Sequence, residues 1–288
     1  MGARKRRDQD AIACTLTSGR TPDREYCART RSGGIRTVED AALIDSFWDA
    51  RRRGEYFPAA WFDKLTIDQA YRIQLGMVHR RCEAGEQQIG WKVGLTAKAM
   101  QEQFGIHEPV FGCVLHCSDN GRCFTPRDLI SPGFENELCM RLGRDLSGVI
   151  TVQEARAAVD VVYPSLEIIE TRGPFTAQIA LALADNAQQK TVVLGAPAAL
   201  PGDLENIEAK VYVNDQLVGS GTGDAVLGNP LNSIVWLAGK LGQYGRKLAP
   251  GEIIMTGSFT RQFPLSPGDR VRTDFSGLGS VETSISSA

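Results

Sequence analysis

The chain has 288 residues, of which 42% are hydrophobic and 23% charged, which is the composition of an ordinary soluble globular protein. That length allows one large domain or two small ones. The net charge of −2 gives no reason to expect a nucleic acid or an acidic membrane as partner, and no apolar run approaches the roughly 18 residues that a membrane-spanning helix requires.

Positive charge is concentrated near the start of the chain. Residues 1–37 carry nine Arg or Lys and four Asp or Glu, so this segment has a net charge of +5 and the remainder −7. Because apolar periodicity is almost absent there, we predict a disordered basic tail. The lack of an apolar run excludes a secretory signal, and an organelle transit peptide is the alternative against which the acidic residues count. The seven cysteines follow no regular framework, which indicates reduced thiols in a cytoplasmic protein.

Residues 38–105 are predicted to form a helical flank that also carries one strand. Apolar side chains recur at a helical period over residues 41–48, and Thr66 is placed to cap a second helix. A short helix is expected over residues 97–104. Between these helices, residues 89–95 alternate between apolar and other side chains as a strand does.

Strands dominate residues 106–288. Asn214-Asp215 separates two alternating segments and indicates a β-hairpin, and helices are expected only near residues 152–159, 177–186 and 232–244. Because no regular βαβ rhythm appears, we predict an α+β fold with a rolled, barrel-like mixed sheet. Residues 38–288 would form a single domain.

Two acidic side chains share one face of a predicted strand over residues 134–142. Side chains alternate along a strand, so Glu135 and Glu137 point the same way while Leu138, Met140 and Leu142 face a core. Like charges that lie so close repel each other unless a positive group lies between them.

A third glutamate, Glu167, interrupts a later run that is otherwise typical of a buried strand. Three carboxylates with no histidine nearby in sequence suit a hard cation such as Mg²⁺. The spacing alone leaves a second interpretation open, in which Glu135 and Glu137 lie on a solvated face and Glu167 pairs with an arginine.

Lys92 lies on a strand face that otherwise consists of Gly90 and Gly94. The glycines leave open space beside the lysine, which would suit a ligand, and a partly desolvated lysine can exchange protons near neutral pH. The alternative is a surface lysine on an edge strand. Further along, Gly257 and Ser258 form either a cradle for a substrate carboxylate or a tight turn.

Together these stretches resemble the 2-keto-4-pentenoate hydratase / 4-oxalocrotonate decarboxylase group of the fumarylacetoacetate hydrolase superfamily. The resemblance covers about residue 38 to the C-terminus, and the segments that carry it are residues 90–96, 134–137, 164–168, 184–187, 226–231, 236–237 and 248–258. It implies a mixed β-roll with a helical flank, a homo-oligomer that can associate with a partner enzyme of the same pathway, and a role in aromatic-compound catabolism.

The resemblance also implies a site. Glu135, Glu137 and Glu167 match the family's ligands for Mg²⁺ or Mn²⁺, Lys92 matches its active-site lysine, and Leu95, with Gly257 and Ser258, falls on substrate-binding positions. The expected activity is that of a lyase, a hydratase that adds water to a 2-hydroxy-2,4-dienoate or its 2-oxo tautomer, with Lys92 moving the proton.

One position departs from the family pattern. Many hydratases of the group carry an aspartate in Pro-Asp-(Phe/Tyr)-Gly, whereas this chain has Pro109-Val110-Phe111-Gly112. A valine cannot move a proton, so a 4-oxalocrotonate-type decarboxylase is the alternative activity. An acylpyruvate hydrolase and a non-catalytic partner subunit are the others.

Overall fold

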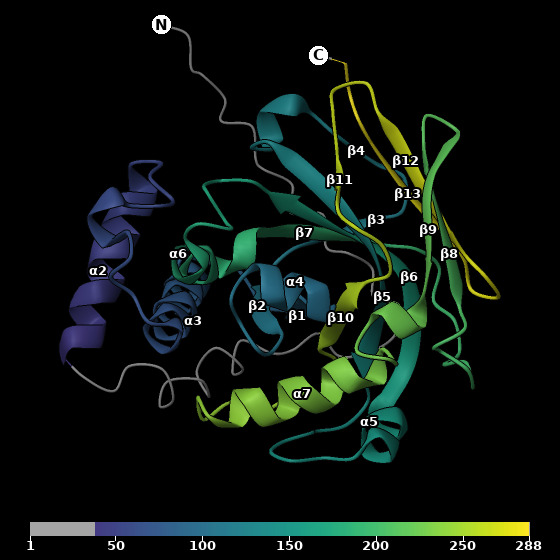
Figure 1. Cartoon of the computed structure of the whole chain (residues 1–288), viewed down its shortest axis with the longest axis horizontal. Helices are drawn as coiled ribbons and strands as arrows, with labels where there is room; N and C mark the ends of the chain where they lie inside the picture. The colour runs from purple at the N-terminus through teal and green to yellow at the C-terminus, as the bar shows by residue number, and fades with distance from the viewer. Residues whose placement is uncertain (1–37, 288) are drawn as a thin grey trace, which may run out of the picture.

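The computed structural model describes residues 38–287, and the predicted basic tail lies outside them. In this part of the chain six α-helices accompany two β-sheets (Figure 1). The helices are α2 (Val38–Arg52), α3 (Ile67–Glu83), α4 (Lys98–Gln103), α5 (Val152–Ala158), α6 (Ile179–Ala184) and α7 (Leu231–Gly242). The predicted fold class, a mixed rolled sheet with a helical flank, is confirmed.

The larger sheet has eight strands and runs in the order β2-β1-β10-β5-β6-β7-β3, with β11 added to β5. Its strands are β1 (Gly90–Gly94), β2 (Val110–Val114), β3 (Cys117–Asp119), β5 (Pro132–Leu142), β6 (Val159–Glu170), β7 (Gln189–Leu194), β10 (Ile253–Ser258) and β11 (Phe263–Pro264). The pairs β1–β10 and β3–β7 are parallel and the other pairs antiparallel, so the sheet is mixed.

This sheet curls so that its two ends approach each other. The Val192 amide of β7 donates to the carbonyl of His116, just beyond β2, and Asn186, just before β7, bonds the backbone of Cys113 in β2. The concave face holds a small apolar cluster that includes Val192, Cys139 and Met255. The acidic side chains discussed below lie on the same face.

The smaller sheet has five strands in the order β4-β13-β12-β8-β9. Its strands are β4 (Arg122–Phe124), β8 (Glu208–Val213), β9 (Gln216–Thr222), β12 (Arg270–Phe275) and β13 (Gly279–Ile285). The predicted hairpin joins β8 to β9, where Asn214 and Asp215 have φ angles of 50° and 63°. Positive φ at both central residues is what a tight hairpin turn requires.

The main core lies on the convex face of the large sheet. Helices α3, α6 and α7, together with the smaller sheet, contribute apolar side chains that pack on Trp91, Phe111 and Leu138 from the strands. Helix α3 begins as predicted, because Thr66 and Gln69 form a reciprocal capping box. Helix α6 ends earlier than predicted, because the backbone turns left-handed from Asn186.

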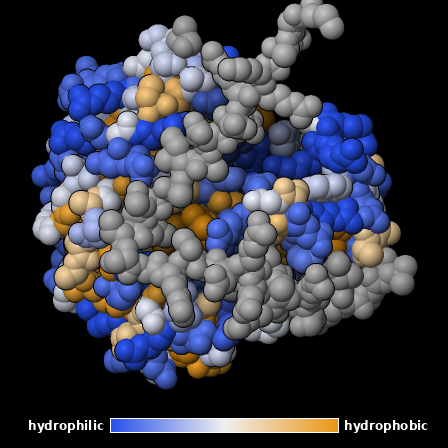
Figure 2. All heavy atoms as spheres, turned by 180° about the vertical axis from the view of Figure 1, so that it is seen from behind, coloured by the Kyte–Doolittle hydropathy of each residue, from blue (hydrophilic) through white to orange (hydrophobic). Residues whose placement is uncertain are grey.

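Seen from behind, the surface of the described residues is largely hydrophilic with separate hydrophobic areas (Figure 2). None of the helices between residues 38 and 287 is both long and apolar enough to cross a membrane.

Candidate metal centre and its lysine

Three carboxylates meet on the concave face of the large sheet. Glu135 and Glu137 project from β5, and Glu167 projects from the neighbouring strand β6. One oxygen from each lies within 4.8 Å of the others. The alternation of β5 places the first two on one side, and the antiparallel register places Glu167 directly opposite Glu135. Glu137 and Glu167 are buried, and Glu135 is partly exposed.

Lys92 reaches this cluster from two strands away. It stands on β1, with β10 and β5 between its strand and β6, yet its Nζ lies 3.2 Å from Glu167 Oε2. The curl of the sheet brings the two side chains together across the concave face. Glu167 therefore pairs with Lys92 and not with an arginine, and Lys92 is buried on an interior strand and not exposed on an edge.

Burial and mutual repulsion shift the proton affinities of all four groups. Burial raises the pKa of Glu167 to about 7, against the favourable charge of Lys92. The pKa of Glu137 is raised well above its usual range by burial and by the other two carboxylates, and burial also raises the pKa of Glu135. Burial opposes the charge of Lys92, but the three carboxylates outweigh it and raise its pKa.

The donor set suits a hard divalent cation. Every ligand atom is a carboxylate oxygen, which Mg²⁺, Mn²⁺ and Ca²⁺ prefer. Glu137 Oε1 and Glu167 Oε1 are buried without a hydrogen-bond partner among the described residues, a costly condition that a cation would relieve. Within residues 38–287 no other group of three or more His, Cys, Asp or Glu side chains has metal-binding geometry.

A bulge in β10 fixes the orientation of Glu137. The register between β10 and β5 shifts between Met255 and Ser258, and Gly257 takes a φ of +115° there. Its amide donates to Glu137 Oε2 at 2.8 Å, and the Ser258 hydroxyl donates to the carbonyl of Asn136 at 3.3 Å. The Gly257 amide therefore orients the Glu137 side chain, and the Ser258 hydroxyl bonds the backbone of the strand that carries it. The contact of Gly257 and Ser258 with a substrate carboxylate stays a prediction.

The glycines around Lys92 serve two different purposes. A Cβ at Gly94 would lie 3.2 Å from Lys92 Nζ and 3.5 Å from Val110 Cγ2, so the bare backbone there does leave room beside the ammonium. At Gly90 the expectation of open space is wrong, because a Cβ would overlap the carbonyl oxygen of Ile253 on β10. Gly90 instead permits close strand pairing.

Leu95 directly follows the strand that carries Lys92. It is partly buried, its φ is +54°, and its carbonyl accepts a hydrogen bond from Gln101 Nε2 at 2.9 Å. The next residue, Thr96, is buried, and its side chain leaves no room for a Cβ at Gly257, since that atom would lie 2.6 Å from Thr96 Cγ2. Sequence reasoning missed Thr96, although it directly follows the lysine strand.

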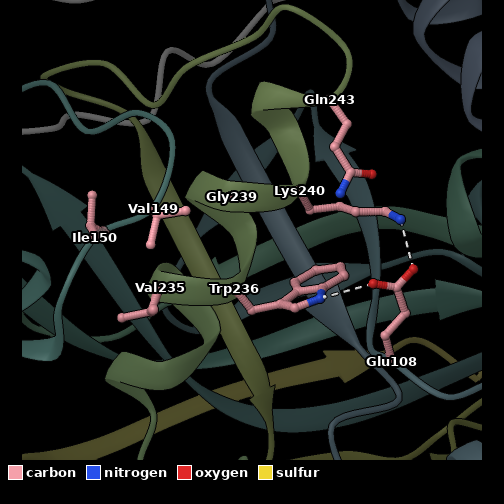
Figure 3. A pocket seen from close by; sticks show the side chains of 8 residues that line it. All are labelled: Glu108, Val149, Ile150, Val235, Trp236, Gly239, Lys240 and Gln243. Carbon is pink, nitrogen blue, oxygen red and sulfur yellow. Dashed lines mark hydrogen bonds and ion pairs between the residues drawn. The ribbon is translucent and has the colours of Figure 1, made fainter.

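A surface pocket has none of the three glutamates or Lys92 in its lining. Its volume is about 230 Å³, and Trp236 and Lys240 of α7 line it together with Glu108 and Val149 (Figure 3). Glu108 accepts hydrogen bonds from Trp236 Nε1 at 3.3 Å and from Lys240 Nζ at 2.6 Å. The polar groups of this pocket are thus largely satisfied by one another.

The family model for the C-terminal domain of fumarylacetoacetate (FAA) hydrolase matches residues 117–286. The chain belongs to the fumarylacetoacetate hydrolase family. It is 35% identical over 232 residues to the 2-keto-4-pentenoate hydratase of Paraburkholderia xenovorans (strain LB400), which covers 78% of this chain and 86% of that relative. It is 32% identical over 225 residues to a 4-oxalocrotonate decarboxylase of Pseudomonas sp, covering 77% and 88% of the two chains.

Among solved structures of the family, the fold matches 4-oxalocrotonate decarboxylase from Pseudomonas putida G7 complexed with magnesium and adipate. The TM-score is 0.80 at 29% sequence identity, and the match covers 87% of this chain and all of the other. A second structure of that decarboxylase carries calcium and acetate. A hydratase and a decarboxylase are therefore both relatives of this chain.

Proposed function

We propose that this chain is a divalent-metal-dependent hydratase. Its substrate would be a 2-hydroxy-2,4-dienoate and its product a 4-hydroxy-2-oxo acid. The observation that carries the proposal is the convergence of the three glutamates, two of them buried, with Lys92 Nζ 3.2 Å from Glu167 Oε2. The hydratase among the relatives supports the reaction class, and the magnesium of the related decarboxylase supports Mg²⁺ or Mn²⁺ as cofactor.

Glu135, Glu137 and Glu167 would hold the cation, with Gly257 orienting Glu137. When bound, the cation supplies a Lewis-acid centre for the carboxylate and the 2-oxygen of the substrate. Charge compensation of the three carboxylates by a bound cation would remove the interaction that raises the pKa of Lys92, so the lysine would lose its proton more readily.

Lys92 then handles the proton. In its neutral form the Nζ amine would take the proton of the substrate's 2-hydroxyl group, and the resulting ammonium would deliver a proton to the terminal carbon, which converts the dienol into a conjugated 2-oxo-3-enoate. Water adds to carbon 4 of that product. Met255, which is paired with Lys92 in the register of β1 with β10, and Cys139 belong to the buried apolar cluster on the same face of the sheet.

The test is turnover of 2-hydroxypenta-2,4-dienoate by the purified protein with Mg²⁺. The dienol absorbance should fall, and NMR should show a 4-hydroxy-2-oxo acid as the product. Removal of the metal by a chelator should abolish the reaction, and added Mn²⁺ should restore it. Substrate that stays unchanged in the metal-loaded protein would overturn the hydratase proposal.

A second candidate is decarboxylation of a 4-oxalocrotonate-like acid through the same dienolate. The observation that favours it is Val110, whose Cγ2 borders the same space beside Gly94 as Lys92 Nζ. An apolar wall there offers no second group to orient water. Release of CO₂ from 4-oxalocrotonate, with no hydration of the dienoate, would select this activity.

Val110→Asp separates the two candidates further, because it places a carboxylate beside the lysine. In a decarboxylase the change should slow CO₂ release, and it should introduce or increase hydration of the dienoate. The remaining alternatives give different products. An acylpyruvate hydrolase releases pyruvate by C–C cleavage, and a non-catalytic partner subunit binds a 2-oxo acid without turnover.

The proposal includes a cytoplasmic homo-oligomer in aromatic-compound catabolism that can associate with a pathway partner enzyme. The seven cysteines follow no regular disulfide framework in the sequence, which supports a reducing compartment. Size-exclusion chromatography with light scattering measures the oligomeric state directly.

A further inference from the structure

The free edge of β2 is closed by side chains instead of a strand. The Cys113 amide donates to Asn186 Oδ1 at 2.7 Å, and Asn186 Nδ2 donates to the Cys113 carbonyl at 2.8 Å. One carboxamide thus reproduces the pair of bonds that a neighbouring antiparallel strand would make. Two residues earlier, the Phe111 carbonyl accepts a hydrogen bond from Gln74 and its amide donates one to the hydroxyl of Tyr71.

Asn186 holds this position in an unfavourable backbone conformation. The φ angles of Asn186, Ala187 and Gln188 are 58°, 48° and 59°, and none of the three is glycine. Left-handed backbone at consecutive non-glycine residues is rare, because Cβ approaches the following carbonyl. Such strain persists where the surrounding structure determines it, and it is concentrated at functional sites.

Buried ion pairs anchor the start of this turn. Arg172 Nε lies 2.5 Å from Asp185 Oδ2, and Arg172 Nη2 donates to the Asp185 carbonyl at 3.0 Å. Arg51 of α2 adds a contact of 3.3 Å to the other carboxylate oxygen. The side chains of Arg172 and Asp185 are only 4% and 5% exposed, so this anchor is part of the interior.

The turn reaches Lys92 through Gly112. Gly112 stands directly opposite Lys92 in the pairing of β1 with β2. A Cβ on Gly112 would lie 3.1 Å from the Asn186 carbonyl oxygen and 3.2 Å from Lys92 Cγ. The methylene chain of Lys92 and the left-handed turn at Asn186 therefore lie on either side of the Gly112 Cα. Displacement of the turn would change the space that the methylene chain occupies.

We infer that Asn186 is a positioning residue for Lys92. Its carboxamide holds β2 in place, so that the lysine stem extends over Gly112 and its ammonium meets Glu167. Asn186 belongs to neither the acid trio nor the substrate-binding positions and acts only through the strand. The inference rests on the proposed proton transfer by Lys92, and its test includes two measurements that need no substrate.

Asn186→Gly is the decisive variant, because glycine accepts positive φ without strain while both bonds to Cys113 are lost. Hydrogen exchange of residues 110–114 should accelerate at least ten-fold. In the crystal structure of the variant, Lys92 Nζ should lie more than about 4 Å from Glu167 Oε2, beyond contact of an ion pair. The kcat for the dienoate should fall ten-fold or more, with KM and the Mn²⁺ dissociation constant within two-fold of wild type.

Asn214→Gly is the matched control. Asn214 also has positive φ and two side-chain hydrogen bonds, from the Arg270 amide and to Asp269 Oδ1, but it lies in the β8–β9 hairpin of the other sheet. It should leave the exchange of β2 and kcat unchanged.

Three results overturn the inference. They are an unmoved Lys92 in the Asn186→Gly structure, a loss of kcat no greater than in Asn214→Gly, and a parallel loss of Mn²⁺ affinity.

If the Gly variant does not fold, Asn186→Asp takes its place. It keeps the acceptor for the Cys113 amide but turns an oxygen toward the Cys113 carbonyl, so the same displacement is expected. If wild type shows no turnover, the proposed function fails, while exchange and crystallography still decide the position of Lys92.

Discussion

Glu135 and Glu167 lie directly opposite each other in the antiparallel pairing of β5 with β6. Like charges at such positions destabilise a sheet, and removal from water adds a desolvation cost. Lys92 provides one ammonium for three carboxylates. The metal-free protein is therefore destabilised at this cluster, and a divalent cation would relieve the destabilisation.

Glu135→Gln should stabilise the metal-free protein and lower its affinity for the metal ion. One repulsive charge disappears, so we expect a higher melting temperature, by about 2–4 °C for each kcal/mol gained in a domain of roughly 150–250 residues. The Mn²⁺ dissociation constant should rise at least ten-fold, in keeping with the loss of a ligand. Thermal unfolding with and without Mn²⁺ measures both effects.

The control for that variant is Glu102→Gln, a change at an exposed residue of α4. It should alter neither the melting temperature nor the response to Mn²⁺. A metal-free Glu135→Gln protein that melts below wild type would contradict the destabilising role of the acid pair.

Stability and metal affinity should depend on pH in opposite directions. The pKa of Glu167 is raised to about 7 by burial, whereas glutamate in an unfolded chain titrates near 4.3. Between these values the folded metal-free protein keeps a proton that the unfolded chain has lost, so the contribution of Glu167 to stability falls as pH rises. Metal binding needs the ionised carboxylate, so Mn²⁺ affinity should rise over the same window.

Two measurements check this linkage. Urea unfolding of metal-free wild type and Glu167→Gln between pH 5 and 7.5 should give a stability difference that moves against wild type as pH increases. Calorimetric Mn²⁺ titrations in two buffers should show protons released near pH 6. An affinity that is constant across this range would exclude a carboxylate that titrates so high.

Lys92→Met should separate chemistry from metal binding. The substitution keeps most of the side-chain length and removes the ammonium, so turnover should fall by about 10²–10⁴-fold, the usual contribution of a proton-transfer group. Mn²⁺ should still bind, because all three carboxylates remain. Lys98→Met, at an exposed residue of α4, is the control, and a Lys92 variant that retains a tenth of wild-type turnover would argue against the proton-transfer role.

Gly257→Ala should weaken the metal site through backbone geometry. A Cβ there meets Thr96 Cγ2 at 2.6 Å, and the φ of +115° disfavours alanine, so we expect a loss of about 1–3 kcal/mol in stability. The Glu137 bond to the Gly257 amide should also lengthen, which lowers Mn²⁺ affinity.

Gly277→Ala separates the two causes, since Gly277 has a φ of +74° with nothing within 4 Å of an added Cβ. That variant should lose stability without any effect on Mn²⁺. Equal Mn²⁺ affinity in the two variants would show that the Gly257 amide does not orient Glu137.

Local chemistry made much of the fold predictable. Thr66 with Gln69 specifies the start of α3, Asn214-Asp215 specifies the hairpin, and the alternation along β5 puts Glu135 and Glu137 on one face. Each of these signals acts over only a few residues, so no knowledge of the tertiary structure is needed to read it.

Long-range relationships were harder to predict. The register that sets Glu135 opposite Glu167, and the curl that carries Lys92 across two strands, depend on pairings between distant segments. The same limit explains the error at Gly90, whose missing side chain accommodates the Ile253 carbonyl. Asn186 gave only a weak signal, a residue tolerant of left-handed backbone after a short helix.

The charge balance around Lys92 also sets the order in which the metal ion and the substrate bind. When all three carboxylates are ionised, the single ammonium of Lys92 leaves two negative charges without a counterpart. An organic anion approaching the metal-free cluster is repelled, whereas a bound dication cancels the excess. The divalent metal ion should therefore bind first and the substrate anion second. In the reverse direction, the organic anion should dissociate before the metal ion does.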